Sequence, residues 1–379
     1  MAFIVKFVKT IRNNWKKSVF LSGVAAYGFH YSKGIYEDSV IRKAYCEEAK
    51  IYGNQPLQTG ERARKITVFL NPAAKKGFTE YEGQAKKYMD VLEDTDAIVV
   101  AGGDGTIAEA SFSKIPIGVI PLGHTNTMAK YLYKKDKSDA KWMLDAALSV
   151  VKGATCHADV MKITDEENRT VFAVNSFEWG AFKEAENRAK KYWYFGPLKR
   201  HWTYLMSTTS RWPPIIQGHF SYVNYCSGCS NCHKPPPKQQ WKWWHIFLSP
   251  KVEVPQKDYS KIQNAECGTE HEEDFSSIEL TAHINQLSEP NKKTDQGILL
   301  SIGPSSVTKL EFVKEGWHRL KEDPSKNWRD TKDLEQFRLL PKGEQSHPFY
   351  IIDNEQYEIM PVTVELLRDK ISLFYITSP

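Results

Sequence analysis

Short apolar runs alternate with helical patterns in the first part of the chain. Residues 66–70 are β-branched or apolar and end abruptly at a turn signal, which predicts a buried strand. Residues 79–82 form a capping box ahead of apolar positions at helical spacing. Residues 97–101 are continuously apolar, as in a strand covered on both faces, and a similar run lies at 115–120. Strands that alternate with helices and end in glycine loops predict a parallel α/β sheet.

The pattern changes after residue 155, where short strands follow one another with loops rather than long helices between them. These predicted strands cover residues 159–163, 170–175, 219–223, 277–284 and 298–302. Such spacing favours an antiparallel β-sandwich. We therefore expect an α/β lobe over residues 65–155 and a mainly antiparallel β-sandwich lobe over residues 156–379.

The first 36 residues carry six lysines and arginines and no acidic residue. Apolar residues from Ile4 to Trp15 recur at helical spacing, which is typical of a mitochondrial presequence or a basic helix on an anionic membrane. The apolar stretch at 19–29 is shorter than the roughly 20 residues that a membrane span needs, so it is a short anchor or an interfacial segment. We predict a targeting or anchoring segment at 1–36. The alternative is an exposed basic helix that has no targeting role. Residues 37–64 are expected to form a helical connector and linker.

Composition excludes several classes of protein. A length of 379 residues suggests two domains. Hydrophobic residues at 41% and charged residues at 26% are ordinary globular values, which argue against wholesale disorder and against a polytopic membrane protein. The formal net charge of +5 is too small to argue for nucleic acid, so no nucleic-acid partner is expected.

Six cysteines are too few for a disulfide scaffold, but three of them cluster. Cys226, Cys229 and Cys232 have the spacing C-x-x-C-x-x-C inside an expected insertion at about 225–270. They could hold zinc if a fourth ligand such as Cys267 converged on them. Because no second C-x-x-C exists, the sequence favours a disulfide or free thiols on a solvated loop.

The loop after the strand at 97–101 carries the most chemistry. It reads Gly102, Gly103, Asp104, Gly105, Thr106. Glycines let the backbone approach a ligand closely, and a helix that starts here would direct N–H groups at a phosphate. Asp104 could bind Mg²⁺ through the phosphates or accept a proton from an attacking hydroxyl. The alternative, a hairpin turn, would need alternating strands on both sides. Neither a P-loop nor a G-x-G-x-x-G motif occurs in the chain.

Several motifs together resemble the nucleotide-binding lobe of the diacylglycerol kinase, sphingosine kinase and ceramide kinase superfamily. They are Asn71-Pro72 with Gly77, the stretch from Thr79 to Ala85, the glycine loop at 102–106, and residues 121–126 with Gly123, Thr125 and Asn126. The blocks at 191–199 and 352–361 resemble a mitochondrial member of that superfamily.

The resemblance implies transfer of the γ-phosphoryl group of ATP to the hydroxyl of monoacylglycerol or diacylglycerol, giving lysophosphatidic or phosphatidic acid. It also implies Mg²⁺, a mitochondrial inner-membrane location facing the intermembrane space, and a C-terminal return towards the nucleotide lobe. The implied nucleotide-binding residues are Asn71, Pro72, Gly77, Thr79, Gly102, Gly103, Gly105, Thr106, Gly123, Thr125, Asn126 and Asp353. Asp104 and Glu355 are the candidate bases, and Asp104 would also hold Mg²⁺ through the phosphates. Asn354 replaces a glycine of the superfamily's Asp-Gly-Glu motif and can adopt the same left-handed turn. The alternative for Asp353 and Glu355 is a solvated turn.

The resemblance further implies that the second lobe faces the lipid. Asp159 and Trp179 are candidate substrate-binding residues, and the aromatic residues Trp179, Phe182 and 192–195 could line an acyl channel. A turn or cap for Asp159 and core packing for the aromatic residues are the alternatives. The cluster at 241–244 has a membrane-interface composition, with packing on the sandwich as an equal alternative.

Two departures from the superfamily pattern bear on activity. Gly77 runs almost directly into Thr79, so one helix and one strand are expected to be missing. Residues 105–114 leave about ten residues for a crossover that usually takes a dozen or more. A second functional class is therefore a weak or inactive member, which acts as a membrane assembly subunit of the inner-membrane carrier translocase.

Overall fold

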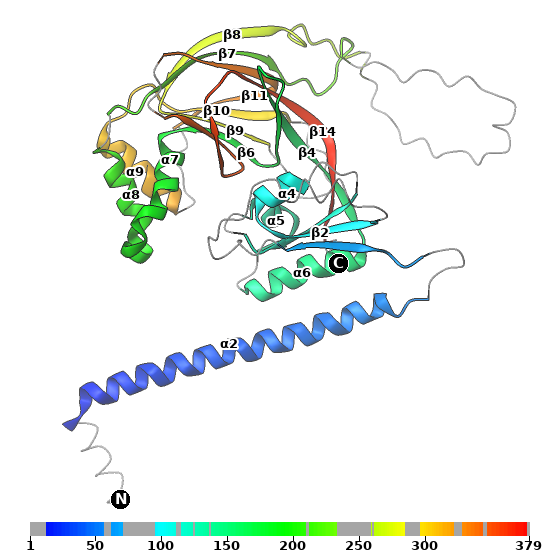
Figure 1. Ribbon diagram of the computed structural model, residues 1–379, viewed down its shortest axis with the longest axis vertical. Coiled ribbons are helices and arrows are strands. Elements are labelled where there is room, and N and C mark those ends of the chain that lie inside the picture. Colours follow the sequence, from blue (N-terminus) through cyan, green and yellow to red (C-terminus); the bar gives the residue numbers. More distant parts are fainter. Residues whose placement is uncertain are drawn as a thin grey trace, which may run out of the picture.

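The computed structural model describes residues 13–56, 62–70, 95–110, 115–123, 126–135, 138–209, 212–232, 259, 261–284, 296–321, 328–343 and 347–376. Figure 1 shows a β-rich lobe stacked on an α/β lobe, with the long helix α2 below α6.

The α/β lobe contains the parallel sheet that the sequence predicts. Its strands are β1 (Ile66–Leu70), β2 (Ala97–Gly102) and β3 (Ile117–Pro121), and its helices are α4 (Asp104–Ala110), α5 (Thr127–Leu132) and α6 (Asp139–Lys152). β2 lies between β1 and β3, pairs in parallel with both, and is buried along its whole length. Because the glycine loop passes from β2 into the two-turn helix α4, the hairpin alternative is excluded.

The strand at 66–70 is confirmed, but the prediction that it is buried is wrong. Ile66, Val68 and Leu70 are 43%, 60% and 65% exposed. These three side chains share one face of the strand, whereas Phe69 on the other face packs towards the core. Within the described residues β1 pairs only with β2, so it is also an edge strand.

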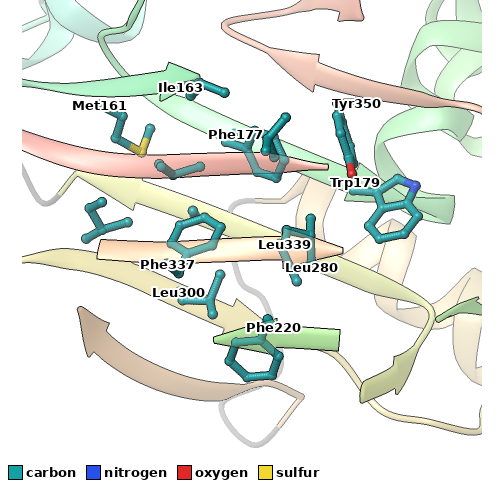
Figure 2. Packing of buried hydrophobic residues seen from close by; sticks show 14 of the residues in the cluster. Met161, Ile163, Phe177, Trp179, Phe220, Leu280, Leu300, Phe337, Leu339 and Tyr350 are labelled. Carbon is teal, nitrogen blue, oxygen red and sulfur yellow. The ribbon is translucent and has the colours of Figure 1, made fainter. Parts of the chain in front are cut away.

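The β-rich lobe is mainly antiparallel, as expected. Its strands are β4 (Thr155–Asp165), β5 (Thr170–Ala173), β6 (Ser176–Gly180), β7 (Ile216–Asn224), β8 (Glu270–Ser277), β9 (Glu279–Ile284), β10 (Ile298–Ile302), β11 (Asp330–Pro341), β12 (Phe349–Ile352), β13 (Glu355–Glu358) and β14 (Val362–Phe374). Instead of two separate sandwich sheets, the strands belong to one hydrogen-bonded sheet in the order β1-β2-β3-β14-β11-β10-β9-β6-β12-β13, from which β4 and β7 branch. Figure 2 shows the core that this sheet encloses, with Phe177, Trp179 and Tyr350 packed together.

Helices in the β-rich lobe were not predicted, and the expectation of loops there is wrong. The lobe contains α7 (Ala181–Arg188), the 3₁₀ segment η2 (Ala189–Leu198), α8 (Lys199–Ser207) and α9 (Lys309–Leu320). α9 begins with a capping box, in which the Thr308 hydroxyl accepts a hydrogen bond from the Glu311 N–H and the Glu311 carboxylate accepts one from the Thr308 N–H. The buried Phe312 and Val313 then hold this helix on α7 and α8.

One strand links the two lobes. β14 is antiparallel to β11 and β4, and its Leu373 pairs in parallel with Ile117 of β3. The sheet therefore runs without interruption from the first lobe into the second.

The N-terminal helix α2 (Trp15–Gly53) is continuous across residue 36 and has no buried residue. Side-chain contacts join it to the α6 region: Tyr45 donates to Asp145, Ser138 donates to Asp38, and Lys152 pairs with Glu48. The apolar residues at 19–29 are exposed, with Phe20 and Phe29 more than 70% exposed. In the described part of the chain, no helix has an apolar stretch long enough to cross a bilayer.

Candidate active site

The two predicted glycine loops touch each other at the carboxyl ends of β2 and β3. The carbonyl of Gly102 accepts hydrogen bonds from the N–H groups of Leu122 (3.2 Å) and Gly123 (2.9 Å). A Cβ atom on Gly123 would collide with the backbone of Gly103. The Asn126 side chain fixes this arrangement, since its Oδ1 accepts from the Gly123 N–H (3.0 Å) and its Nδ2 donates to the Gly123 carbonyl (2.8 Å). Glycine at 123 is therefore required by close backbone approach.

Asp104 ties the first glycine loop to the start of α5. Its Oδ2 accepts from the Thr127 N–H at 2.9 Å and its Oδ1 from the Met128 N–H at 3.1 Å, and the residue is 3% exposed. These bonds satisfy amides that the helix itself leaves unpaired. Asp104 thus positions the second loop, while each carboxylate oxygen keeps a further lone pair for a ligand.

The turn at 353–355 is buried at its first residue. Asp353 (φ 44°) and Asn354 (φ 76°) both adopt the left-handed conformation, as expected for Asn354. Asp353 accepts three backbone hydrogen bonds, from Val174 (2.6 Å), Asn175 (2.9 Å) and Ser176 (3.0 Å). Burial raises the pKa of Asp353 to about 7; the three N–H bonds oppose this shift and the charge of Asp104 adds to it. A solvated turn is excluded for Asp353.

Glu355 brings this C-terminal turn against the N-terminal glycine loop. A Cβ atom on Gly105 would lie 2.8 Å from Glu355 Oε1, so the carboxylate occupies the space beside that glycine. Its Oε2 accepts a hydrogen bond from the Tyr357 hydroxyl at 3.0 Å. Both candidate bases, Asp104 and Glu355, therefore lie at the same loop although 250 residues separate them in the sequence.

A cavity of about 230 Å³ lies between the lobes at this point. The α/β lobe lines it with Asp104, Thr127, Met128 and Tyr131, and the β-rich lobe lines it with Asn175, Ser176, Glu178, Lys183, His283, Ile284, Asp353 and Asn354. Concave sites with a few convergent polar groups are the usual form of a substrate site.

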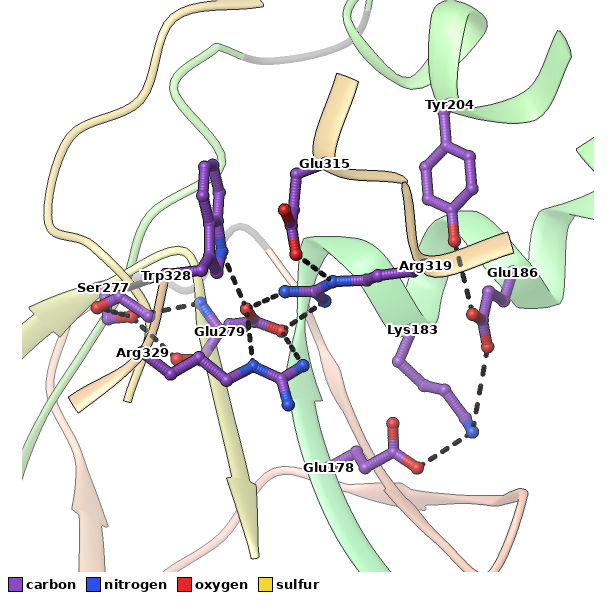
Figure 3. Close-up of polar contacts among 11 residues, drawn as sticks. Glu178, Lys183, Glu186, Tyr204, Ser277, Glu279, Glu315, Arg319, Trp328 and Arg329 are labelled. Carbon is purple, nitrogen blue, oxygen red and sulfur yellow. Dashed lines mark hydrogen bonds and ion pairs between the residues drawn. The ribbon is translucent and has the colours of Figure 1, made fainter. Parts of the chain in front are cut away.

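The cavity includes a partly buried ion pair that the sequence did not reveal. Figure 3 shows Lys183 directed at Glu178, with Nζ to Oε1 at 2.9 Å. Burial disfavours the charged form of Glu178, but the positive charge of Lys183 and the hydrogen bonds from Lys183 and Ser176 outweigh this effect, so the pKa of Glu178 is lowered. The available signal was a glutamate between two aromatic residues, Phe177 and Trp179. Burial also lowers the pKa of His283, which favours the neutral imidazole.

Asp159 does not line this cavity. Its carboxylate accepts from Arg368 Nη1 (2.6 Å) and from the Asp369 N–H (2.8 Å), next to a register shift between β4 and β14. These contacts favour a structural role in holding the irregular part of β14.

Trp179 is part of the core. It is 1% exposed, packs edge-on against Phe275 and Tyr350, and donates from Nε1 to the His347 carbonyl at 3.1 Å. It contributes to a second, smaller cavity of about 100 Å³. Phe182 is also buried, whereas Trp193 is 76% exposed, so the aromatic residues do not form one continuous channel wall.

Other predicted features lie outside the described residues. These are Asn71, Pro72, Gly77, Thr79 and Thr125, the helix expected after the capping box, and the cluster at 241–244. They stay predictions.

Two protein-family models together match most of the chain. The diacylglycerol kinase catalytic domain model matches residues 59–163, and the acylglycerol kinase C-terminal model matches residues 174–378. The chain belongs to the acylglycerol kinase family. It is 34% identical over 409 residues to "Acylglycerol kinase, mitochondrial" from Homo sapiens, which covers 97% of this chain and 96% of that protein. The protein of the same name from Xenopus laevis is 34% identical over 422 residues, covering 98% of this chain and 95% of that protein.

Membership of the acylglycerol kinase family makes this chain a lipid kinase, and it confirms the superfamily resemblance. A diacylglycerol kinase crystal structure from Bacillus anthracis str. Sterne has the same fold, with a TM-score of 0.50 at 16% identity, covering 83% of this chain and 97% of that chain. The alignment to the human relative spans 409 positions, more than the 379 residues of this chain, so some positions of that relative have no counterpart here.

Proposed function

We propose that this member of the acylglycerol kinase family transfers the γ-phosphate of ATP to monoacylglycerol or diacylglycerol at a mitochondrial membrane. The products are lysophosphatidic or phosphatidic acid. The observation that carries the proposal is the position of Glu355 against Gly105, which sets a carboxylate from the second lobe beside the glycine loop of the first. The names of the relatives, "Acylglycerol kinase, mitochondrial", support the acceptor and the location.

Phosphoryl transfer depends mainly on positioning and on charge, so each residue has a limited task. The touching glycine loops at 102–106 and 121–126 hold the nucleotide phosphates. Glu355 accepts the proton of the acceptor hydroxyl while the hydroxyl oxygen forms a bond to the γ-phosphorus. The bond between the γ-phosphorus and the β–γ bridging oxygen breaks, and ADP is released. Asp353 holds the turn that carries Glu355 through its three backbone hydrogen bonds.

The family implies a divalent cation, and the side chains at the cavity fit Mg²⁺. Magnesium prefers oxygen ligands and is usually held by one or two carboxylates together with substrate phosphates. Asp104 and Asp353 both line the cavity, and the charge of Asp104 contributes to the raised pKa of Asp353, as expected for two nearby carboxylates. Asp104 would hold the ion through the phosphates, where it would neutralise charge on the transferring group.

The direct test is transfer of labelled γ-phosphate from ATP to a panel of monoacylglycerol, diacylglycerol, sphingosine and ceramide. We expect label in the acylglycerols and at most a tenth as much in sphingosine or ceramide. Omission of Mg²⁺ should abolish the label in every acceptor. Preferential labelling of sphingosine or ceramide would contradict the proposed acceptor class.

We expect that deletion of residues 1–35 releases the protein from mitochondrial membranes and leaves the body folded. The deletion removes the basic segment, while the contacts of α2 with the body come from Asp38, Tyr45 and Glu48, which remain. Carbonate extraction of isolated mitochondria measures the release, and circular dichroism checks the fold. If the truncated chain stays with the carbonate-washed membranes, the anchor is elsewhere, and the cluster at 241–244 is the next candidate.

A protease-protection experiment tests the proposed location on the inner membrane, facing the intermembrane space. It uses the full chain in mitochondria whose outer membrane has been opened.

We also expect weak Mg-ATP binding, because a helix and a strand are predicted to be missing after Gly77. The exposed face of β1, formed by Ile66, Val68 and Leu70, supports this prediction. If only a tenth of the molecules hold the loops in the binding arrangement, the apparent Kd rises about tenfold. Calorimetry should find weak binding that tightens when a helix–strand insert from a relative is placed after Gly77. Tight binding by the present chain would contradict the deletion argument, and a folded chain without turnover would favour the assembly-subunit function.

A further inference from the structure

Four cysteines converge at the base of the connection between β7 and β8. Cys226 follows β7 by two residues, Cys229 and Cys232 come next, and Cys267 precedes β8 by three residues. All four are unpaired thiols, and their sulfur atoms lie within 4.8 Å of one another. Cys267, which the sequence alone could not place, therefore lies together with the other three cysteines.

The spacing of the sulfur atoms fits a single tetrahedral metal ion. A Zn–S bond of about 2.3 Å gives sulfur atoms about 3.8 Å apart at the corners of a tetrahedron. Cys229 Sγ and Cys232 Sγ are 3.7 Å apart, and Cys232 Sγ and Cys226 Sγ are 3.8 Å apart. A disulfide would bring two sulfur atoms to about 2.05 Å. A four-iron cluster would hold them farther apart, because each thiolate binds a different iron.

The surrounding groups favour thiolates and fix the two chain segments. The Asn231 N–H donates to Cys229 Sγ (3.4 Å), the Cys229 N–H donates to Cys232 Sγ (3.2 Å), and Asn264 Nδ2 donates to Cys226 Sγ (3.3 Å). Hydrogen bonds of this kind are the usual outer contacts of metal-bound thiolates.

A backbone hydrogen bond also joins the two segments directly. The Ser230 N–H donates to the Ile262 carbonyl at 2.9 Å, and Asn231 Nδ2 donates to the Asn264 carbonyl at 3.3 Å, so the turn at 226–232 is held to the segment that leads to Cys267. Gly228 has φ 122° and faces the Tyr259 ring so closely that a side chain at this position would collide with it. The turn is thus shaped by contacts that do not depend on the thiols alone.

We propose that Cys226, Cys229, Cys232 and Cys267 bind one structural Zn²⁺. Four thiolates leave no open coordination position, so the ion is structural rather than catalytic. Its role is to clamp the two ends of the long connection between β7 and β8, which holds these neighbouring strands in register where they leave the sheet.

Metal analysis of the full chain, purified without chelators, tests the proposal. We expect about one zinc per chain. Cys226→Ser and Cys267→Ser should each lower the zinc content at least fivefold, whereas Cys267→His should keep it because histidine is also a zinc ligand. Cys46→Ser is the matched control and should retain the wild-type zinc content, since Cys46 is exposed on α2.

A second measurement needs no variant and therefore does not depend on whether a variant folds. Wild-type protein stripped of metal under reducing conditions should take up one Co²⁺ per chain, with the intense visible absorption of a tetrahedral tetrathiolate site. The proposal would be overturned if the loaded protein held less than about a fifth of an equivalent of zinc, or if it held iron in place of zinc. It would also be overturned if the mass of the intact protein showed the loss of hydrogens that accompanies disulfide formation.

Discussion

Replacement of Glu355 by glutamine is expected to lower phosphoryl transfer by roughly 10²–10⁴-fold, the usual contribution of a general base. Glutamine has nearly the same shape and can still accept a hydrogen bond from Tyr357, but it cannot accept the proton of the acceptor hydroxyl. The loss should therefore appear in kcat, with little change in the KM for ATP.

Glu358→Gln provides a matched control, because Glu358 is exposed at the other end of the same strand, β13. We expect nearly full activity from that variant and unchanged thermal unfolding for both. Wild-type kcat in Glu355→Gln would remove Glu355 from the reaction and leave Asp104 as the remaining candidate base.

Replacement of Glu279 by alanine is expected to cost about 3–5 kcal/mol of unfolding free energy, the usual result of breaking a buried ion pair from one side. Glu279 is 2% exposed and binds two arginines, Arg319 (2.5 and 2.8 Å) and Arg329 (3.1 and 3.2 Å), as Figure 3 shows. Trp328 Nε1 also donates to it at 3.1 Å. Without the carboxylate, two partly buried guanidinium groups would lose their shared partner.

Urea denaturation measures the loss, and Glu272→Ala is the control, because the Glu272 side chain is 68% exposed and should contribute less than about 1 kcal/mol.

The contribution of Glu279 should also depend on pH. Burial disfavours the ionised form of Glu279, but Arg319 and Arg329 outweigh this effect and lower the pKa of Glu279. Its stabilisation is therefore present above the unfolded carboxyl pKa of about 4.3 and is lost as the pH falls through the lower folded value. The difference between wild type and Glu279→Ala should narrow over that acidic range; a constant or absent difference would contradict the role of the ion pair.

The sequence predicted the strand β2, the glycine loop after it and the turn at Asn354 correctly because their signals are local. A continuous apolar run defines β2, and the glycines at 102, 103 and 105 mark the end of that strand. Asn354 was expected to tolerate a left-handed turn from its side-chain chemistry alone, and it has φ 76°. In these cases neighbouring residues determine the conformation.

Features that depend on distant parts of the chain were missed. The three N–H groups that bind Asp353 come from residues 174–176, and no local pattern records that pairing. The role of Asp159 depends likewise on Arg368, and the exposed face of β1 depends on which layers cover it. The type of a single residue does not show which distant residue, here about 200 positions away in the sequence, it will contact in the fold. The helix α9 is different, because its capping box was readable from the sequence and was overlooked.

The strand β14 has a consequence for how this fold can be divided. A boundary drawn at residue 155 falls on the first residue of β4, and β4 pairs with β14 from Thr155 to Asp165. The fragment before that boundary would lose β14, which pairs with β3, whereas the fragment after it would keep the β4–β14 ladder but leave the β14 edge that faces β3 open. The two lobes are therefore not exchangeable modules, and a chimera between family members would have to take β3 and β14 from the same parent.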